Sequence, residues 1–416
     1  MERLYTQTNS FLIKSMKKIV LALFIGIVGT SFGQIQNTWT KMGDFAGLKR
    51  ERAVAFSIGN YGYTGTGIDT AEIVHNDLWQ YDASLDAWSQ VASMPGSIRR
   101  NAVGFSINDK GYIGTGINTV AATDIGAVKL ADLWEYDPTL NSWIQKANFP
   151  GFGGLGMYFT TAFSVGDKAY LVGGKLGPNN YSNQTWEYDS TNDLWTQKSN
   201  FPGGVRYQLS SFTLNGKGYA GLGTDQDLYR KDWWEYKPSL DQWIARADLP
   251  SSERANATTF SIGSRGFVCM GTNGGSLGDL WEFDEGTNSW NVRASYGGSA
   301  RKGAIAMVVN NRAYVGTGKG VSGKKASMHE YNPYYTVGLN ELDNAISIYP
   351  NPATDVINVN SSAPVEELTL TNMYGQVVLS EAYTKTLNVN GLSAGVYYLT
   401  GQTNGSTIGS QKIIIQ

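Results

Sequence analysis

Short runs in which hydrophobic and polar residues alternate fill most of the chain between residues 35 and 335. Alternation with a period of two is typical of a strand that buries one face. Runs such as residues 53–58 (AVAFSI) and 61–67 (YGYTGTG) are separated by two-residue turns. The 3.6-residue period of an amphipathic helix is missing from this region. The pattern therefore predicts an all-β fold built from many short antiparallel strands.

A longer repeat organises these strands. The phrase Trp-x-[Tyr/Phe]-x6-Trp occurs five times, at intervals of 47–55 residues, which is the length of a four-stranded unit. A predicted hairpin precedes every copy, and a sixth hairpin follows the last one. The six hairpin turns use residues that tolerate positive φ. They are Gly59-Asn60, Asn108-Asp109, Gly166-Asp167, Asn215-Gly216, Gly263-Ser264 and Asn310-Asn311.

The sixth unit lacks a final tryptophan strand. Trp39, in the segment NTWTKMG, matches the missing strand from the other end of the sequence. The N-terminal strand is therefore expected to complete the sixth sheet and close a ring. Closure removes open sheet edges, which otherwise invite aggregation.

This repeat resembles the kelch repeat over residues 34–337. The resemblance implies a six-bladed kelch-type β-propeller, like the propellers of galactose oxidase-like proteins, closed by the N-terminal strand. One feature departs from the family pattern. The Gly-Gly pair that ends the second strand occurs only as Gly173-Gly174, while other copies read Gly-x-Gly, as in Gly65-Thr66-Gly67.

The N-terminus reads as a signal peptide over residues 1–33. A basic stretch (KSMKK) precedes an apolar run at residues 19–28, which is too short to span a bilayer comfortably. Ser31 and Gly33 are the small residues expected before a cleavage site, and Met16 is the more natural start. An uncleaved membrane anchor is the alternative. We expect no transmembrane span after cleavage.

From residue 346 the pattern changes to a second set of short alternating strands. A linker over residues 338–345 and a small immunoglobulin-like β-sandwich over residues 346–416 are predicted. An ordinary adhesion module would fit this pattern.

The same segment also resembles the type A C-terminal sorting domain of the type IX (Por) secretion system. The matching phrases are YPNPA (349–353), YGQ (374–376), LSAGVY (392–397) and KIII (412–415). The resemblance implies that the secretion machinery is a partner and that the protein is secreted or held on the outer-membrane surface. Its sorting-motif residues would be Tyr349, Pro350, Asn351, Pro352, Gly375, Gly395 and Tyr397.

Composition and charge narrow the remaining choices. The 416 residues carry a net charge of −2, which gives no reason to expect a nucleic-acid partner. The single cysteine, Cys269, rules out a disulfide within the chain. The two histidines, His75 and His329, are too few for a typical transition-metal site. No phosphate loop, dinucleotide fingerprint or Ser-His-Asp set is present in the sequence. We expect no metal, no cofactor and, on balance, no enzyme.

One constellation stands out. An arginine lies six residues before the inner-strand aromatic or methionine in five of the six units, so these side chains are expected around the mouth of the central tunnel. Guanidinium groups there would hold an anion through bidentate hydrogen bonds. The third unit breaks the series with Met157-Tyr158-Phe159, and Tyr158 with Tyr207 would stack on a sugar face. Alternatively, the arginines bond to loop carbonyls and acids of the fold. The predicted ligand-binding residues are Arg50, Arg99, Arg206, Arg254, Arg301, Tyr158 and Tyr207.

The sequence favours a secreted or cell-surface binding protein that recognises a glycan or a protein at the tunnel mouth. The long loop at residues 118–131 is its expected specificity element. A sugar-active enzyme, such as an epimerase or mutarotase of an acidic sugar, is the alternative, with Glu51 as a candidate acid or base. A structural module of a surface complex is a third reading.

Overall fold

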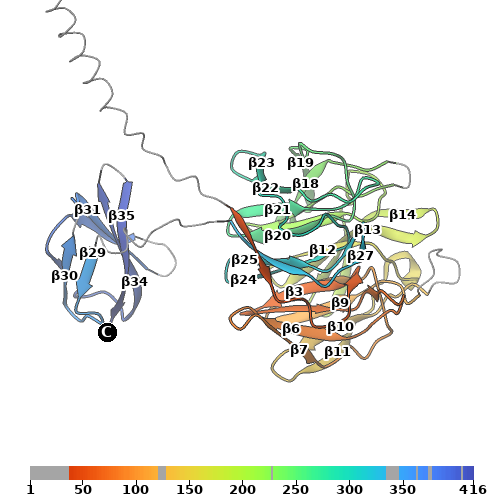
Figure 1. Ribbon diagram of the computed structural model, residues 1–416, viewed down its shortest axis with the longest axis horizontal. Coiled ribbons are helices and arrows are strands. Elements are labelled where there is room, and N and C mark those ends of the chain that lie inside the picture. Colours follow the sequence, from red (N-terminus) through yellow and green to blue (C-terminus); the bar gives the residue numbers. More distant parts are fainter. Residues whose placement is uncertain are drawn as a thin grey trace, which may run out of the picture. The chain divides into compact units, whose positions relative to one another are not determined.

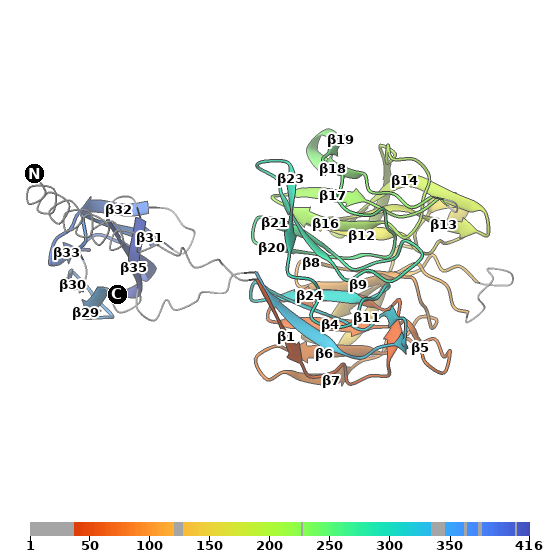
Figure 2. The ribbon, with the colours of Figure 1, turned by 45° about the horizontal axis from the view of Figure 1, so that its top comes forward.

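The computed structural model describes residues 37–119, 128–225, 228–333, 346–361, 364–372, 377–403 and 406–416 (Figures 1 and 2). The chain divides into two compact units, residues 36–334 and a second unit that contains residues 335–416. The predicted signal peptide and the predicted linker lie outside the described residues. Among the described residues, no helix is long and apolar enough to cross a membrane.

The first unit contains six four-stranded antiparallel sheets, here numbered 1 to 6. Sheet 1 is β3 (Val54–Ile58), β4 (Tyr61–Gly65), β6 (Leu78–Asp82) and β7 (Ala87–Val91); sheet 2 is β8 (Val103–Ile107), β9 (Lys110–Gly114), β10 (Leu133–Asp137) and β11 (Ser142–Lys146). Sheet 3 is β12 (Thr161–Val165), β13 (Lys168–Gly177), β14 (Asn180–Asp189) and β15 (Leu194–Lys198). Sheet 4 is β16 (Ser210–Leu214), β17 (Lys217–Gly221), β18 (Trp233–Lys237) and β19 (Gln242–Arg246); sheet 5 is β20 (Thr258–Ile262), β21 (Arg265–Cys269), β22 (Leu280–Asp284) and β23 (Ser289–Arg293).

Sheet 6 combines the two ends of this unit. It contains β24 (Ile305–Val309), β25 (Arg312–Gly316), β28 (Met328–Asn332) and, outermost, β1 (Thr38–Met42). Trp39 of β1 lies opposite Tyr331 of β28. Its indole Nε1 donates to the carbonyl of Ala294 at 2.8 Å, as Trp143 does to Ala92 and Trp195 does to Ala147 between other sheets. The N-terminal strand thus makes the same inter-sheet contact as the tryptophan strands inside the repeat.

Aromatic packing between neighbouring strands and sheets builds the core. In sheet 1, Phe56 of β3 stacks on Tyr63 of β4 with ring centroids 5.4 Å apart. Tyr63 then meets the edge of Tyr136 in sheet 2 at 5.8 Å. Such buried aromatic pairs contribute about 0.5–1.5 kcal/mol each beyond the area they bury. The alternating pattern of the sequence therefore corresponds to an all-β core, and that prediction is confirmed.

Two rings of backbone hydrogen bonds join the six sheets around the centre. In the first ring, a glycine after each second strand donates to a carbonyl of the next sheet at 2.7–3.0 Å, beginning with Gly67 to Arg99 and ending with Gly318 to Arg50. These glycines have φ between 83° and 116°, and a Cβ at Gly67 would lie 2.8 Å from the carbonyl oxygen of Glu51. The last glycine of this turn is thus required by conformation and by space, also in sheet 5, which reads Cys269-Met270-Gly271 and not Gly-x-Gly.

The second ring lies just before the inner strands, and we call its six residues the neck. Each neck residue donates its N–H to the carbonyl of the neck residue in the preceding sheet at 2.9–3.3 Å, so the ring closes on itself. All six have left-handed backbones with φ of 52–59°. The neck residues are Arg52, Asn101, Phe159, Gln208, Asn256 and Gly303.

Two small two-stranded sheets and two short 3-10 turns complete the first unit. They are β2 (Arg50–Glu51) paired with β5 (Ile68–Asp69), β26 (Lys319–Gly320) paired with β27 (Gly323–Lys324), and the 3-10 turns η1 (Gly151–Gly154) and η2 (Pro238–Leu240).

The second unit has two sheets around its own core. A three-stranded sheet contains β29 (Ile346–Tyr349), β30 (Val356–Ser361) and β33 (Thr386–Asn388). A four-stranded sheet contains β31 (Glu367–Asn372), β32 (Val377–Ala382), β34 (Gly395–Thr403) and β35 (Ser406–Ile415). Its buried cluster, which includes Ile357, Leu370 and Ile413, consists only of residues from this unit.

One of the predicted sorting-motif residues, Asn351, holds the C-terminal strand in place. The Asn351 side chain donates to the Lys412 carbonyl at 2.7 Å and accepts the Ile414 N–H at 2.9 Å. Tyr397 is buried and donates its hydroxyl to the Ser393 carbonyl at 2.8 Å. Tyr349, Pro350 and Pro352 flank Asn351, and Gly395 begins β34. Gly375 lies outside the described residues.

Candidate functional site

The five predicted arginines are buried rather than displayed. Arg50, Arg99, Arg206, Arg254 and Arg301 are each no more than 2% exposed. In every case Nη1 donates to the carbonyl of the residue that precedes the inter-sheet glycine, as Arg50 does to Thr66 at 2.8 Å and Arg99 does to Thr115 at 3.1 Å. The guanidinium groups therefore face into the sheets and belong to the joints between them.

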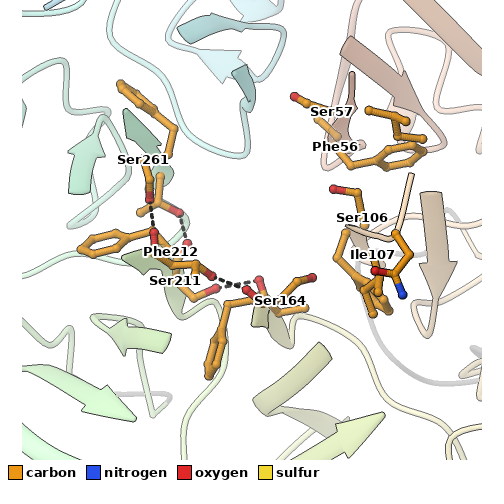
Figure 3. Close-up of a pocket in the computed structure, with 18 of the residues that line it drawn as sticks. Phe56, Ser57, Ser106, Ile107, Ser164, Ser211, Phe212 and Ser261 are labelled. Carbon is orange, nitrogen blue, oxygen red and sulfur yellow. Dashed lines mark hydrogen bonds between the residues drawn. The ribbon is translucent and has the colours of Figure 1, made fainter. Parts of the chain in front are cut away.

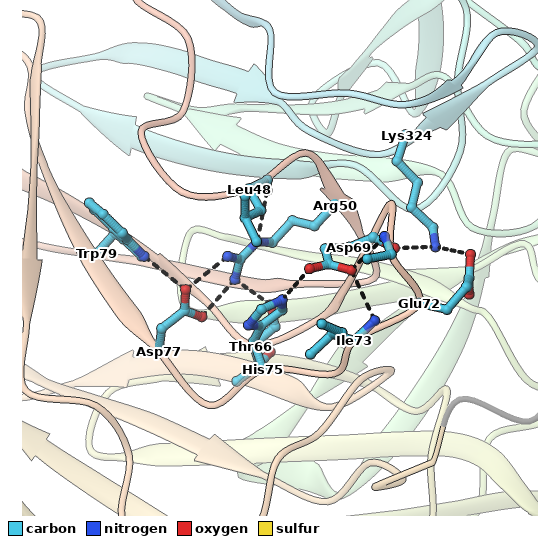
Figure 4. Close-up of polar contacts among 11 residues, drawn as sticks. Leu48, Arg50, Thr66, Asp69, Glu72, Ile73, His75, Asp77, Trp79 and Lys324 are labelled. Atoms are coloured by element: carbon cyan, nitrogen blue, oxygen red, sulfur yellow. Dashed lines mark hydrogen bonds and ion pairs between the residues drawn. The ribbon is translucent and has the colours of Figure 1, made fainter.

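Four of these arginines also pair with an aspartate of their own sheet. Arg50 makes a bidentate pair with Asp77 at 2.6 and 2.8 Å, and the Trp79 indole donates to the same carboxylate at 2.9 Å (Figure 4). Burial alone would raise the pKa of Asp77, but the hydrogen bond and charge of Arg50 outweigh it and hold that pKa below its usual value. The other three pairs are Arg99–Asp132, Arg206–Asp232 and Arg254–Asp279.

Sheets 3 and 6 lack this Arg–Asp–Trp arrangement. In both, another residue replaces the aspartate. Sheet 3 has Met157 in place of the arginine, and Gln184 accepts the Trp186 indole N–H at 2.9 Å. In sheet 6, Arg301 has no carboxylate partner among the described residues: it donates to Ser327 Oγ at 3.0 Å and, like the other four, to the carbonyl before the inter-sheet glycine, that of Thr317, at 2.9 Å. Burial lowers the pKa of Arg301. The expected ring of open guanidinium groups is thus not what the structure contains, and the arrangement matches the structural alternative.

The accessible polar site at this end of the tunnel is a cavity of about 300 Å³, which we call the pit. Tyr158 and Tyr207, two of the predicted ligand-binding residues, both line it. Its other walls come from the residues that follow the buried arginines and from the loops after the second strands. The loop residues 120–127, most of the expected specificity element, lie outside the described residues.

An aromatic wall forms the side of the pit that belongs to sheets 3 and 4. Phe159 lies between Tyr158 and Tyr207, with ring centroids 5.4 and 5.7 Å away. Tyr181 stacks on Tyr207 at 5.0 Å. The Lys175 ammonium lies 5.3 Å from the centroid of Tyr207. Aromatic faces with cations beside them provide a platform for the C–H face of a polar ring.

Charged side chains from sheets 1 and 6 contribute the remaining polar wall. Arg52 lies 3.5 Å from the nearly buried carboxylate of Glu51, and its guanidinium stands over Phe159 at 5.2 Å. Glu72 is fixed by Lys324, whose buried Nζ donates to Glu72 at 2.6 Å and to the Asp69 carbonyl at 2.6 Å (Figure 4). Glu51, which sequence reasoning raised only as an enzymatic candidate, therefore lines the pit.

Below the pit, the six neck residues surround a smaller cavity of about 120 Å³. Arg52, Asn101, Phe159 and Gln208 line both cavities, so the neck forms the floor of the pit. Alanines 53, 102, 257 and 304, with Leu209, line the cavity below the floor. The neck could have been predicted from the sequence, because each neck residue follows the arginine position of its unit by two residues.

The opposite mouth has a different chemistry. Its cavity of about 540 Å³ is lined by small hydroxyl residues of the inner strands, and the side chains of Phe56 and Phe212 point away from it (Figure 3). Thr213 Oγ1 donates to the Ser164 carbonyl at 2.8 Å, and Ser261 Oγ donates to the Thr213 carbonyl at 2.7 Å. Several of these hydroxyls therefore tie neighbouring inner strands together.

The histidines and the cysteine are accounted for by local packing. His75 Nε2 lies 3.0 Å from the buried carboxylate of Asp69. His329 occupies the tryptophan position of sheet 6, and its Nδ1 lies 3.0 Å from the Tyr296 hydroxyl. Burial raises the pKa of the Cys269 thiol. Across the described ranges, no three His, Cys, Asp or Glu side chains gather as metal ligands.

Comparison with known proteins adds two sequence families and one fold. Residues 347–416 match the secretion system C-terminal sorting domain, and residues 157–202 match the kelch motif. The solved structure titled "Structure of YjhT" has a TM-score of 0.59 and 15% identity, and it covers 77% of this chain and 99% of its own. Likeness at this identity concerns the fold alone. No curated protein matches the sequence significantly. Because 795 chains of solved structures match, the architecture is a common one and does not by itself specify an activity.

Proposed function

Because the chain carries a kelch motif and a secretion system C-terminal sorting domain, we propose that it is exported to bind a carbohydrate in the pit of its β-propeller. The sorting domain indicates type IX secretion to the cell surface or the extracellular space, with the secretion machinery as a partner. The propeller is the part that meets the ligand.

The architecture on which this proposal rests is a single closed ring. We assign the six four-stranded sheets as six blades of one propeller, and we assign the second unit as an immunoglobulin-like sandwich. The two closed rings of inter-sheet hydrogen bonds support the first assignment. The packing of a three-stranded sheet and a four-stranded sheet around one apolar cluster supports the second.

The observation that carries the ligand class is the mixed lining of the pit. Phe159 and Tyr207 present aromatic surface, with the buried Tyr158 packed behind Phe159, while Glu51 and Arg52 offer an acceptor and donors on the facing wall. Sugar rings have an apolar C–H face and a polar hydroxyl edge, so they suit a site of this kind. A volume of about 300 Å³ suits one or two sugar residues rather than the side of a folded protein.

A glycan array tests this proposal directly. The chain without residues 1–33 would be screened as wild type, as Tyr207→Ala and as Tyr61→Ala. Tyr61 is 39% exposed and does not line the pit, so it is the matched control. We expect wild type and Tyr61→Ala to share the same bound glycans and Tyr207→Ala to bind them about tenfold more weakly. An array with no bound glycan above background would contradict the proposal.

A sugar-active enzyme remains the second candidate, and one observation favours it. Glu51 is only 5% exposed and lines the pit, and its carboxylate lies 3.5 Å from Arg52 Nε. A carboxylate in such a position suits proton transfer to or from a sugar. Faster anomer equilibration of uronic or sialic acids with wild type than with Glu51→Gln would support it; identical rates would remove it.

A further inference from the structure

Basic side chains outnumber acidic ones in the lining of the pit. The charged residues of this lining are Arg52, Arg100, Lys175 and Lys319 on one side of the balance and Glu51 and Glu72 on the other. The buried Lys324 ammonium also lies 2.6 Å from Glu72 and compensates its charge. The whole chain, in contrast, has a net charge of −2. Positive charge is therefore concentrated in this cavity, and such a concave site attracts anions.

Arg52 has hydrogen-bond donors that the described part of the chain does not use. Its side chain is 26% exposed, with Nε 3.5 Å from the Glu51 carboxylate and the guanidinium 5.2 Å from the centroid of the Phe159 ring. Of its three guanidinium nitrogens, only Nε is buried without a hydrogen-bond partner. Nη1 and Nη2 therefore reach solvent. Because Arg52 lines both the pit and the cavity below it, this solvent lies in the tunnel.

Lys319 is a second cation beside the same carboxylate. Its side chain is 49% exposed, and its Nζ lies 4.0 Å from Glu51 Oε1, while Arg52 lies near Oε2. Both separations exceed the upper limit of about 3.2 Å for a normal N–H···O hydrogen bond. Glu51 thus keeps the two cations close to one carboxylate and leaves donors of both for a ligand.

An oxyanion suits this pair of cations better than a neutral group does. The nitrogens of a guanidinium form a planar fork that binds a carboxylate or a sulfate through parallel, charge-assisted hydrogen bonds. An ammonium adds a compact positive charge. A sugar hydroxyl could accept one of these bonds, but it would leave the excess positive charge of the pit uncompensated.

We propose that the carbohydrate bound in the pit is acidic, and that its oxyanion, a carboxylate or a sulfate, is held by Nη1 and Nη2 of Arg52 with Lys319 beside them. The inference rests on the proposed carbohydrate-binding function and names the class of sugar. The aromatic wall with Tyr207 receives the ring, and Arg52 selects its charge. The anion site expected from the sequence is thus assigned to the arginine of the neck instead of the five buried ones.

The binding test compares sugars that differ in one group. Glucose, glucuronate and glucose 6-sulfate carry a hydroxymethyl group, a carboxylate and a sulfate ester at the same position. Each would be titrated into the chain without residues 1–33 and followed by saturation-transfer NMR. We expect at least one charged sugar to bind about tenfold more tightly than glucose. Raising NaCl from about 0.05 M to about 0.5 M should weaken that sugar at least about threefold and leave glucose unaffected.

Three variants assign the preference to its residues. Arg52→Gln introduces the residue type that sheet 4 has at this neck position, where Gln208 has φ of 58°, so the backbone tolerates it. It should reduce binding of the charged sugar to the level of glucose, and Lys319→Gln should weaken that binding about threefold. Arg312→Gln is the matched control. It removes one positive charge from a side chain that is 43% exposed and does not line the pit, so the preference should remain.

The outcomes separate this inference from the function beneath it. A preference for only one charged sugar supports the inference and identifies the oxyanion. If glucose binds as tightly as both charged sugars, or if Lys319→Gln and a folded Arg52→Gln both keep the full preference, the inference is overturned and the carbohydrate-binding function stands. If no sugar binds in the titrations or on the array, the function fails and the inference fails with it.

Discussion

At the scale of single residues, the buried arginines connect neighbouring sheets through hydrogen bonds. Arg99 joins three parts of the fold: its Nη1 and Nη2 reach Asp132, its Nη1 also reaches the Thr115 carbonyl, and its own carbonyl accepts from Gly67 of sheet 1. The Asp132 carboxylate also accepts the Trp134 indole N–H at 2.7 Å. Loss of one partner of such a buried pair leaves an uncompensated charge, which is far more costly than the absence of both.

Sheet 3 has an uncharged combination where the other sheets have the Arg–Asp pair, and this gives a testable prediction. Arg99→Met alone should lower the free energy of unfolding by about 3 kcal/mol, because Asp132 loses its partner. Arg99→Met with Asp132→Gln copies the Met157 and Gln184 combination of sheet 3 and should recover most of that loss. Chemical denaturation of both variants measures the difference. Equal stability of the single and double variants would show that Asp132 without its arginine partner does not destabilise the fold.

A second pattern in the sequence, besides the spacing of the arginines, indicates this pairing. An aspartate stands two residues before the first tryptophan of the phrase in four units, and these are the four units in which Arg50, Arg99, Arg206 or Arg254 is present. Where the aspartate is replaced by Gln184 or Ser327, the arginine is missing or lacks a carboxylate partner. Correlated change inside a repeat therefore distinguishes a structural arginine from one that is free to hold a ligand.

At the scale of elements, sheet 6 is the unusual one, because it is assembled from both ends of the first unit. Lys41 of β1 lies opposite His329 of β28, which replaces the tryptophan of the other sheets. Tyr296 and Arg301 are the other groups beside this histidine, and Val315 is its neighbour on β25. Burial, with the positive charges of Lys41 and Arg301, lowers the pKa of His329 to about 4, against a small opposing effect of Asp44.

This histidine makes ring closure sensitive to acid. Unfolded chains protonate histidine below about pH 6.5, while the folded protein keeps His329 neutral until about pH 4. Unfolding therefore takes up a proton in this interval, and the free energy of unfolding should fall as the pH drops from 6.5 to 4. Melting temperatures of wild type and His329→Gln across that range test this. The wild-type value should fall more steeply; parallel curves would exclude a role for His329.

At the scale of the whole molecule, the two units have separate cores. Every buried residue in the core cluster of the second unit comes from that unit, and its C-terminal strand is tied down by Asn351. Within the first unit, Thr38 and Asn332 face each other at the ends of β1 and β28 that lie away from the pit. Both ends of the described first unit therefore lie away from the pit.

Removal of residues 338–416 should thus leave the propeller intact and change only its destination. The melting transition of residues 34–337 is expected at the temperature of the first unit in the longer chain. The shortened protein should remain on the inner side of the outer membrane and not reach the cell exterior. Calorimetry and cell fractionation provide the two readings. A large drop in melting temperature would show that the units stabilise each other, and unchanged export would show that the sorting domain is dispensable.

The overall fold was more predictable than the site, for a physical reason. Strand alternation, turn chemistry and the Trp39 match are local features, and each repeats, so errors in one copy are corrected by the others. The pit is built from residues where the copies differ, such as Glu51, Tyr158 and Gln208, and their meeting depends on ring closure. The repeat spacing predicted that Tyr158 and Tyr207 lie at the mouth. The direction of the arginine side chains depends on their aspartate and carbonyl partners, which the spacing does not reveal.

The most direct test of the account is to locate the ligand on one mouth of the tunnel. The strongest glycan from the array would be titrated calorimetrically into wild type, Arg52→Ala in the pit and Asp109→Ala at the opposite mouth. We predict about tenfold weaker binding for Arg52→Ala and unchanged binding for Asp109→Ala. The reverse result, or equal binding by all three proteins, would contradict the assignment of the pit as the binding site.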